Sequence, residues 1–356
     1  MSVIMIFLGL GIIVIYSSSA IYALDKFGSS AYFLWRQLLW TVIGLGAACF
    51  FIVYDHRKLK FWIQPMLLAS VVLLILVLIF GREVSGAKRW LRIGGIGFQP
   101  SEFVKLVLVL FVAGYCDRKR SKMQNFRKGL LPLLAVIGGI CGLIFLQPDM
   151  GTPILILLTC VTMIFMGGGK ILHLTGLAAF FAPLAGLAAW IEPYRRRRIL
   201  AFLSPWENAQ GSSYQLVQSL LAMGSGGLTG VGLGDSHSKL LYLPEPHTDF
   251  IFPIFGEEFG LAGSLAVLVL FGLMAWLGFR IAARTTNLFS SLVASGITIL
   301  TLYQAILNIA MVTGCIPTKG LPLPFLSFGG SSLVVTLSAM GILLNISRYS
   351  RREGDL

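Results

Sequence analysis

An aspartate stands where a long polar loop, residues 191–249, meets a long apolar stretch. It lies in the run Pro244-Glu245-Pro246-His247-Thr248-Asp249-Phe250-Ile251-Phe252. A charged side chain at the edge of a membrane helix is costly, so it indicates a function by default. Because carboxylates commonly transfer protons, Asp249 is our candidate for the residue that performs chemistry. The alternative is structural, since Thr and Asp are both favoured N-terminal caps of helices.

Two further motifs place acids next to loops on the same side of the membrane. Glu102 and Lys105 lie three residues apart in Gln99-Pro100-Ser101-Glu102-Phe103-Val104-Lys105, so they can pair on one helix face. They form either a local ion pair beside an interfacial anchor or part of a cleft that handles a polar headgroup. Asp149 follows a proline in Gln147-Pro148-Asp149-Met150-Gly151, which indicates either a simple turn or a residue that shapes the cavity.

Several cations share these loops. The run Tyr194-Arg195-Arg196-Arg197-Arg198 indicates an anionic partner such as phosphate, or anionic lipid headgroups in general. Lys239 follows in the same loop, and Lys319 lies in a later loop whose Pro and Gly residues forbid a continuous helix. Ser331, in Gly329-Gly330-Ser331-Ser332, opens the last apolar stretch and offers either an anion site or an ordinary cap.

The glycine-rich run Gly224-Ser225-Gly226-Gly227-Leu228-Thr229-Gly230-Val231-Gly232-Leu233-Gly234 superficially resembles a dinucleotide fingerprint. No strand precedes it and its spacing is wrong, so it predicts flexible turns, whose bare N–H groups could still meet a phosphate. Downstream, Glu257 is deep enough in the next span that it must face the bundle, a cavity or a partner. Gly256 and Gly260 form a small-residue face for close helix approach, either to a partner helix or internally.

The composition sets the class of protein that positions these residues. The chain has 356 residues, of which 56% are hydrophobic and only 12% charged, against about 25% charged in soluble domains. It is therefore an all-α, polytopic integral membrane protein, a single transmembrane domain over residues 1–356. We expect no cleavable signal peptide, and the five scattered cysteines predict neither a disulfide framework nor a metal site.

About ten spans follow if each helix takes roughly 20 apolar residues. They are 3–22, 32–54, 61–80, 103–116, 130–146, 151–168, 171–190, 250–279, 287–311 and 331–346. The fourth looks short, and we expect polar residues that face the bundle to extend it.

The basic residues set the orientation and account for the formal net charge of +13. With both termini in the cytoplasm, the cytoplasmic segments hold 15 of the 28 Lys and Arg residues but only four acids, as the positive-inside rule expects. The loop 191–249 and the motifs above are then extracytoplasmic. The net charge therefore reflects membrane orientation, and we expect membrane lipid but no nucleic acid as a partner.

The motifs around Asp249, Glu102, Asp149 and Ser331 together resemble the SEDS family (shape, elongation, division and sporulation proteins), and the resemblance covers essentially the whole chain. Pro317-Thr318-Lys319-Gly320, and Pro193-Tyr194-Arg195 leading to Phe202 and Pro205-Trp206, favour the division or sporulation type (FtsW-like) over the elongation type (RodA-like). Phe328 stands where the family often has Tyr.

The resemblance implies a peptidoglycan glycosyltransferase in the cytoplasmic (inner) membrane of a bacterium, with an extracytoplasmic active site. It polymerises lipid II into β-1,4 glycan with inversion and releases undecaprenyl pyrophosphate. Such a leaving group needs no acid, so the reaction needs one base and positive charge for the phosphates. Asp249 is expected to deprotonate the acceptor's 4-hydroxyl. The residues expected to bind substrate are Arg198, Lys105, Glu102, Asp149, Lys239, Glu245, His247, Thr248, Lys319 and Ser331.

The resemblance also implies partners. We expect a class B penicillin-binding protein, which is a transpeptidase, and other division proteins. No cofactor is expected to be tightly bound, although Mg²⁺ or another divalent cation could accompany the pyrophosphate. The alternatives are a lipid II flippase and a non-catalytic scaffold. Transporters place their sites near the bilayer midplane, whereas the unusual charge here is mostly outward, with Glu257 and Glu258 as exceptions.

Overall fold

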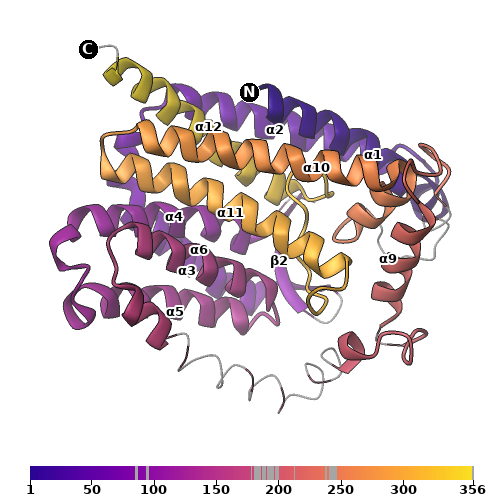
Figure 1. Ribbon diagram of the computed structural model, residues 1–356, viewed down its shortest axis with the longest axis horizontal. Coiled ribbons are helices and arrows are strands. Elements are labelled where there is room, and N and C mark those ends of the chain that lie inside the picture. Colours follow the sequence, from indigo (N-terminus) through magenta and orange to yellow (C-terminus); the bar gives the residue numbers. More distant parts are fainter. Residues whose placement is uncertain are drawn as a thin grey trace. The chain divides into compact units, whose positions relative to one another are not determined.

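The computed structural model describes residues 1–84, 87–93, 96–177, 179, 186, 190, 196, 200–211, 213–236, 239 and 247–354. This part of the chain is almost entirely helical (Figure 1), which confirms the predicted all-α membrane fold. Seven of its helices are long and apolar enough to cross a membrane.

Nine of the ten predicted spans coincide with helices in the described ranges. They are α1 (Ser2–Phe27), α2 (Tyr32–Val53), α3 (Leu59–Phe80), α4 (Pro100–Arg118), α5 (Leu131–Phe145), α6 (Gly151–Met166), α10 (Ile251–Arg284), α11 (Leu288–Val312) and α12 (Gly330–Gly354). The remaining span, 171–190, is helical over 171–177 and lies mostly outside the described residues. Shorter helical turns are η1 (His56–Lys58), η2 (Arg120–Lys122) and η3 (Phe126–Leu130), and α9 (Tyr214–Ser225) is the amphipathic helix of the long loop.

The chain forms two compact units; three of the boundaries between them fall within α2, α10 and α11, and the other two follow Gly176 and Gly329. Unit 1 contains Met1–Leu39, Leu177–Leu273 and Gln304–Gly329. Unit 2 contains Trp40–Gly176, Met274–Tyr303 and Gly330–Leu356.

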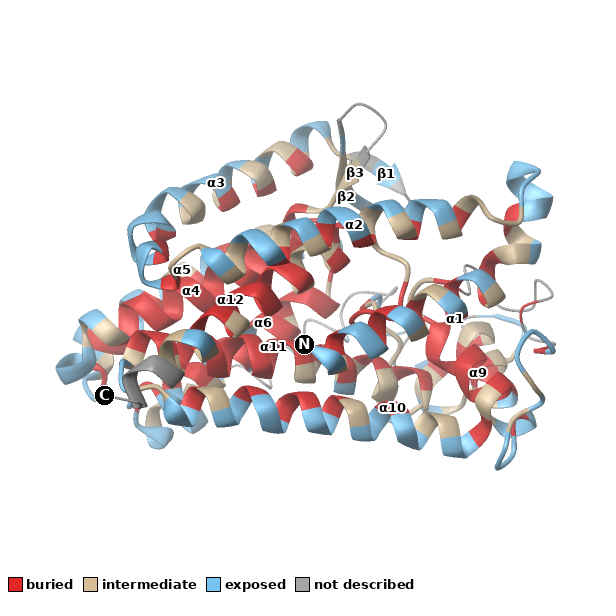
Figure 2. Cartoon of the chain, turned by 90° about the horizontal axis from the view of Figure 1, so that it is seen from above, coloured by how far each residue is buried: buried red, intermediate tan, exposed pale blue. Residues whose placement is uncertain are grey.

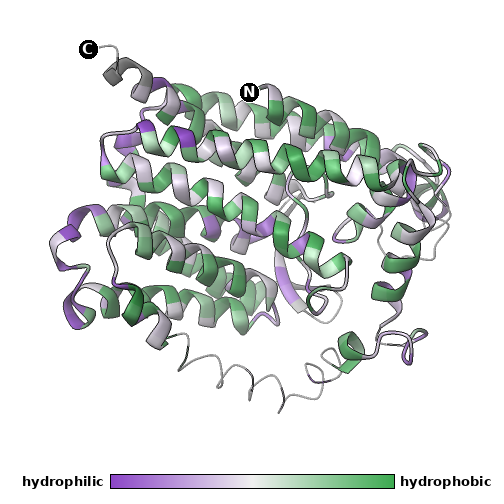
Figure 3. Cartoon of the chain, viewed as in Figure 1, coloured by the Kyte–Doolittle hydropathy of each residue, from purple (hydrophilic) through white to green (hydrophobic). Residues whose placement is uncertain are grey.

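Helix α4 is the core of unit 2. Every residue from Pro100 to Cys116 except Phe103 is buried, and α4 packs against α3 and α6 (Figure 2). This all-round burial explains how the span can start three residues earlier than predicted and still carry charges, because Glu102 and Lys105 face protein and not lipid. Helix α3, by contrast, leaves large apolar side chains such as Phe61 and Phe80 exposed, as a bilayer-facing surface requires. The long helices are hydrophobic over much of their length (Figure 3).

Between α3 and α4 the chain forms a small antiparallel sheet, which the sequence pattern did not predict. Its strands are β1 (Arg82–Val84), β2 (Ala87–Ile93) and β3 (Ile96–Phe98), in the order β1-β2-β3. Glu83 pairs with Lys88 in the β1–β2 register. The guanidinium of Arg89 on β2 donates to the carbonyls of Gln147 and Pro148, so the sheet holds the turn that precedes α6.

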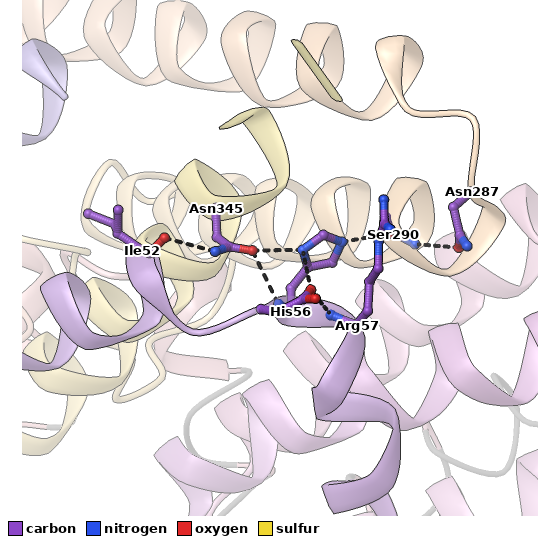
Figure 4. A network of polar contacts seen from close by, with 7 residues as sticks. Ile52, His56, Arg57, Asn287, Ser290 and Asn345 are labelled. Carbon is purple, nitrogen blue, oxygen red and sulfur yellow. Dashed lines mark hydrogen bonds and ion pairs between the residues drawn. The ribbon is translucent and has the colours of Figure 1, made fainter. Parts of the chain in front are cut away.

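At the predicted cytoplasmic end of unit 2, one buried histidine joins three elements (Figure 4). His56 Nδ1 lies 2.7 Å from Asn345 Oδ1 on α12, and its Nε2 lies 2.7 Å from Ser290 Oγ on α11. Asn345 Nδ2 donates to the carbonyl of Ile52 on α2 at 2.8 Å. Asn345 Oδ1 therefore acts as the acceptor, which makes His56 Nδ1 the protonated ring nitrogen.

In unit 1, α10 breaks at Gly260, whose φ of 66° and ψ of −164° are accessible almost only to glycine. The glycine-rich run packs directly on this break. Gly227 and Leu228 carbonyls accept from the N–H groups of Leu261 and Ala262 at 2.9 and 3.1 Å. The predicted small-residue face of α10 is thus covered internally, by backbone rather than by a partner helix.

We predict that Gly260→Ala lowers the free energy of unfolding by about 2–4 kcal/mol. The new Cβ would lie 2.4 Å from the backbone nitrogen of Gly230 and would strain the left-handed backbone. Thermal unfolding of the purified chain in detergent measures this. Gly272→Ala, on the same helix, is the matched control, because a Cβ there meets nothing within 4 Å; equal melting temperatures for the two variants would contradict the prediction.

Candidate functional site

Asp249 lies in a turn, residues 247–250, immediately before α10. The helix begins at Ile251, so Asp249 precedes the N-cap position by one residue. Its side chain is half-buried, whereas Phe250 and Ile251 behind it are buried. Its carbonyl accepts a hydrogen bond of 2.8 Å from Asn308 Nδ2 on α11. The residue therefore stays partly exposed while its main chain is held.

His247 anchors the other side of the turn. Its ring is buried against Phe33, Tyr22 and Phe328, with centroid distances of 4.1, 5.6 and 5.6 Å. Its carbonyl accepts from the N–H of Phe328 at 2.8 Å. Burial, with a smaller effect of the Lys26 charge, lowers the pKa of His247 to about 4. The imidazole is therefore neutral at pH 7 and serves as an aromatic anchor.

The loop that carries Lys319 is held by the side-chain amide of Asn308, which also holds the carbonyl of Asp249. Asn308 Nδ2 also donates to the carbonyl of Leu321 at 2.6 Å, and Gln304 Nε2 donates to the carbonyl of Pro322 at 2.8 Å. Burial lowers the pKa of Lys319. The structure thus brings the segment of the candidate base and the segment of a partly desolvated cation to one side chain of α11.

Lys239 lies in a buried cluster beside the break in α10. Its ammonium is 3.5 Å from Glu258 Oε1 and also donates to the carbonyl of Gly234. Glu258 Oε1 accepts from Ser17 Oγ at 2.5 Å, and Glu257 Oε2 accepts from Ser236 Oγ at 2.5 Å. Both glutamates are buried, as their depth in the span required.

The main-chain N–H groups of the glycine-rich run are used in the same place. Those of Val231 and Gly232 donate to the carbonyls of Glu257 and Glu258 at 3.0 and 3.2 Å. The N–H of Gly234 donates to the Glu258 carboxylate at 3.1 Å. The run therefore completes the protein's own hydrogen bonding, and these three donors are directed at α10 rather than at a phosphate.

Unit 2 holds four other predicted site residues. Lys105 Nζ and Glu102 Oε2 form a buried ion pair of 2.8 Å, which confirms the predicted pairing. Ser331 Oγ accepts from the N–H of Gln99, directly before α4, at 3.1 Å. Asp149 accepts from the N–H and the hydroxyl of Thr152 at 3.1 and 2.7 Å, so it caps the first turn of α6. A role of these residues in substrate binding stays a prediction.

Two predicted site residues, Arg198 and Glu245, lie outside the described residues. Thr248 is half-buried beside Asp249. Sequence reasoning missed Gln304 and Asn308. Their signal was present, because two amides spaced i, i+4 inside a membrane span indicate a polar stripe that must face protein.

The fold and this site define a polytopic membrane protein with a half-exposed aspartate directly before the N-terminus of a helix that breaks at Gly260. The chain matches the cell cycle protein family of FtsW, RodA and SpoVE over residues 1–352. It is 42% identical to the stage V sporulation protein E of Bacillus subtilis, over 98% of this chain and 95% of that protein. It is 40% identical to the probable peptidoglycan glycosyltransferase FtsW of Trichlorobacter lovleyi, over 95% and 89%.

Solved structures of similar proteins support the same family assignment. A structure described as the structural coordination of polymerization and crosslinking by a peptidoglycan synthase complex contains a similar chain, with a TM-score of 0.78, 29% identity and coverage of 98% and 96%. The rod shape determining protein RodA of Thermus thermophilus gives a TM-score of 0.68, 28% identity and coverage of 97% and 94%. This chain therefore belongs to the FtsW/RodA/SpoVE family, and the predicted family and class of enzyme are confirmed.

We predict that replacing His247 changes how stability depends on pH. Between about pH 6.5 and 4 the unfolded chain binds a proton at this residue that the folded chain does not, so folding loses stability as the pH falls. The full shift corresponds to about 3 kcal/mol. His247→Phe keeps the aromatic packing and removes this loss. Its melting temperature in detergent should fall less than that of the wild type from pH 7 to pH 5; parallel curves would refute the assignment.

Proposed function

We propose that the chain is a peptidoglycan glycosyltransferase that polymerises lipid II on the outer face of the cytoplasmic membrane, for division or sporulation septa. Both termini are then cytoplasmic. The similarity to sporulation protein E and to FtsW supports this assignment. The observation that carries this proposal is that Asp249 is half-exposed on a turn whose main chain is held. The carbonyls of His247 and Asp249 in this turn both accept hydrogen bonds.

In the proposed reaction, the Asp249 carboxylate accepts the proton of the acceptor sugar's 4-hydroxyl. The hydroxyl oxygen attacks the anomeric carbon of the donor sugar as the bond from that carbon to the phosphate oxygen breaks. The bonding electrons leave with undecaprenyl pyrophosphate, and the new linkage is β because attack inverts the α configuration. A pinned turn fixes the distance from carboxylate to hydroxyl, which is what a general base requires.

Positive charge must meet the departing pyrophosphate. Lys319 is the best placed of the described cations, because its loop and the Asp249 turn are tied to one amide. Burial lowers the pKa of Lys319 because it disfavours the charged ammonium, and a bound anion would stabilise that charge. Lys239 is already paired with Glu258, so we assign it a supporting role in the loop.

No group of three or more metal-ligating His, Cys, Asp or Glu side chains occurs in the part of the chain that the structure describes. A divalent cation that takes part in the reaction would be held by the substrate's pyrophosphate. We also propose a transpeptidase of the class B penicillin-binding type as partner, since a similar chain forms part of a synthase complex that coordinates polymerization and crosslinking.

The direct test is polymerisation of purified lipid II by the full chain with its cognate transpeptidase. Asp249→Asn is isosteric but cannot accept the proton, so we expect glycan synthesis to fall by at least about 100-fold, the scale of general-base catalysis. Gel separation of labelled glycan products measures the rate.

Asp235→Asn is the matched control, since Asp235 is an exposed acid of the same loop outside the proposed site. It should polymerise at the wild-type rate. Full activity of Asp249→Asn, with an unchanged melting temperature, would rule out Asp249 as the base. A flippase would instead leave glycan absent from the wild type while lipid II crossed the bilayer.

A further inference from the structure

Asn308 is completely buried in unit 1, and one of its atoms holds two loops. Its Nδ2 donates to the carbonyl of Asp249 at 2.8 Å and to the carbonyl of Leu321 at 2.6 Å. Both partners are main-chain acceptors, so the nitrogen and not the oxygen of the amide must face them. The contact therefore reaches the candidate base through its backbone.

The carbonyl of Asp249 needs this donor because of the residue four positions later. In a helix that carbonyl would accept from the N–H of residue 253, but residue 253 is a proline and has no N–H. An unpaired carbonyl at the membrane edge is costly. Pro253 thus releases the Asp249 carbonyl from α10, and Asn308 ties it to α11.

The side-chain amide of Asn308 leaves one of its own polar atoms without a hydrogen bond. Asn308 Oδ1 is buried and has no hydrogen-bond partner among the described residues. A buried acceptor without a partner is unfavourable. The neighbouring Gln304, one turn earlier, donates to the carbonyl of Pro322 in the same loop. Asn308 connects this loop with the Asp249 turn.

We infer that Asn308 is a positioning residue for the glycosyl transfer. It fixes the main chain of Asp249 relative to the Lys319 loop, so that carboxylate and cation keep their spacing while the substrate binds. The inference rests on the proposed role of Asp249 as the base. In this inference Pro253, which has no N–H, leaves the carbonyl of Asp249 without a helical donor, so that this carbonyl can accept from Asn308.

The test measures kcat and KM for lipid II with the full chain and its cognate transpeptidase. Asn308→Leu keeps the approximate volume and removes the donor. We expect kcat to fall roughly 10- to 100-fold, the scale of an ångström-sized misplacement, with KM changed by less than about threefold. Gln304→Leu, which removes the neighbouring amide and its hydrogen bond to Pro322 but keeps both Asn308 contacts, should have the smaller effect on kcat.

Two controls separate positioning from general loss of stability. Asn345→Leu removes an equally buried amide that also donates to a backbone carbonyl, but in the His56 network of unit 2. It should lower the melting temperature without lowering kcat of the folded fraction. Adding Pro253→Ala to Asn308→Leu supplies a helical N–H to the Asp249 carbonyl and should restore part of kcat.

The outcomes are distinguishable. If Asp249→Asn is inactive while Asn308→Leu keeps a kcat within twofold of the wild type, the positioning role is wrong and the proposed base stands. If Asn345→Leu lowers kcat as much as Asn308→Leu does, the effect is structural and the inference is also wrong. If Asp249→Asn is fully active, Asp249 is not the base and the inference loses its premise; a wild type that makes no glycan would overturn the proposed function. Should Asn308→Leu not fold, Asn308→Ala provides the same comparison.

Discussion

A backbone group inside a bilayer has no water to bind, so every irregularity in a span must be satisfied by another part of the protein. Helix α10 contains such an irregularity at Gly260. Carbonyls of the glycine-rich run accept hydrogen bonds from the N–H groups of Leu261 and Ala262, which follow the break. Only glycines allow the two backbones to approach this closely, since a Cβ at Gly230 would lie 2.1 Å from the carbonyl oxygen of Glu258. The long loop is thereby fixed to the span that Asp249 introduces.

The same constraint acts at the start of the span, with a different solution. Pro253 leaves the carbonyl of Asp249 without its helical donor, and the side chain of Asn308 supplies one from α11. His247 is held by the main chain of Phe328 and by aromatic packing. The turn of residues 247–250 is thus anchored by segments far apart in the sequence, while Asp249 stays partly exposed.

These requirements explain what the sequence could predict. Hydropathy located nine described spans, because a helix in lipid must be apolar along its length, and the spacing of Glu102 and Lys105 predicted their ion pair. The sheet of residues 82–98 was not predicted, since its strands are short and broken by glycines. The roles of Asn308 and Gln304 depend on contacts with loops more than ten residues away, and spacing within one helix shows only that the amides face protein.

Glu257, Glu258 and Asp249 of unit 1 differ in burial, and this difference indicates different roles. Glu257 and Glu258 are almost inaccessible and accept hydrogen bonds from Ser236, Ser17 and the glycine-rich run, so they stabilise the break in α10. A general base must instead reach a substrate hydroxyl and later return its proton to solvent. Among these three acids only Asp249 combines an accessible carboxylate with a main chain that is held in place. Such an acid can be rigid without being buried, because hydrogen bonds to the carbonyls of Asp249 and His247 fix the main chain of the turn.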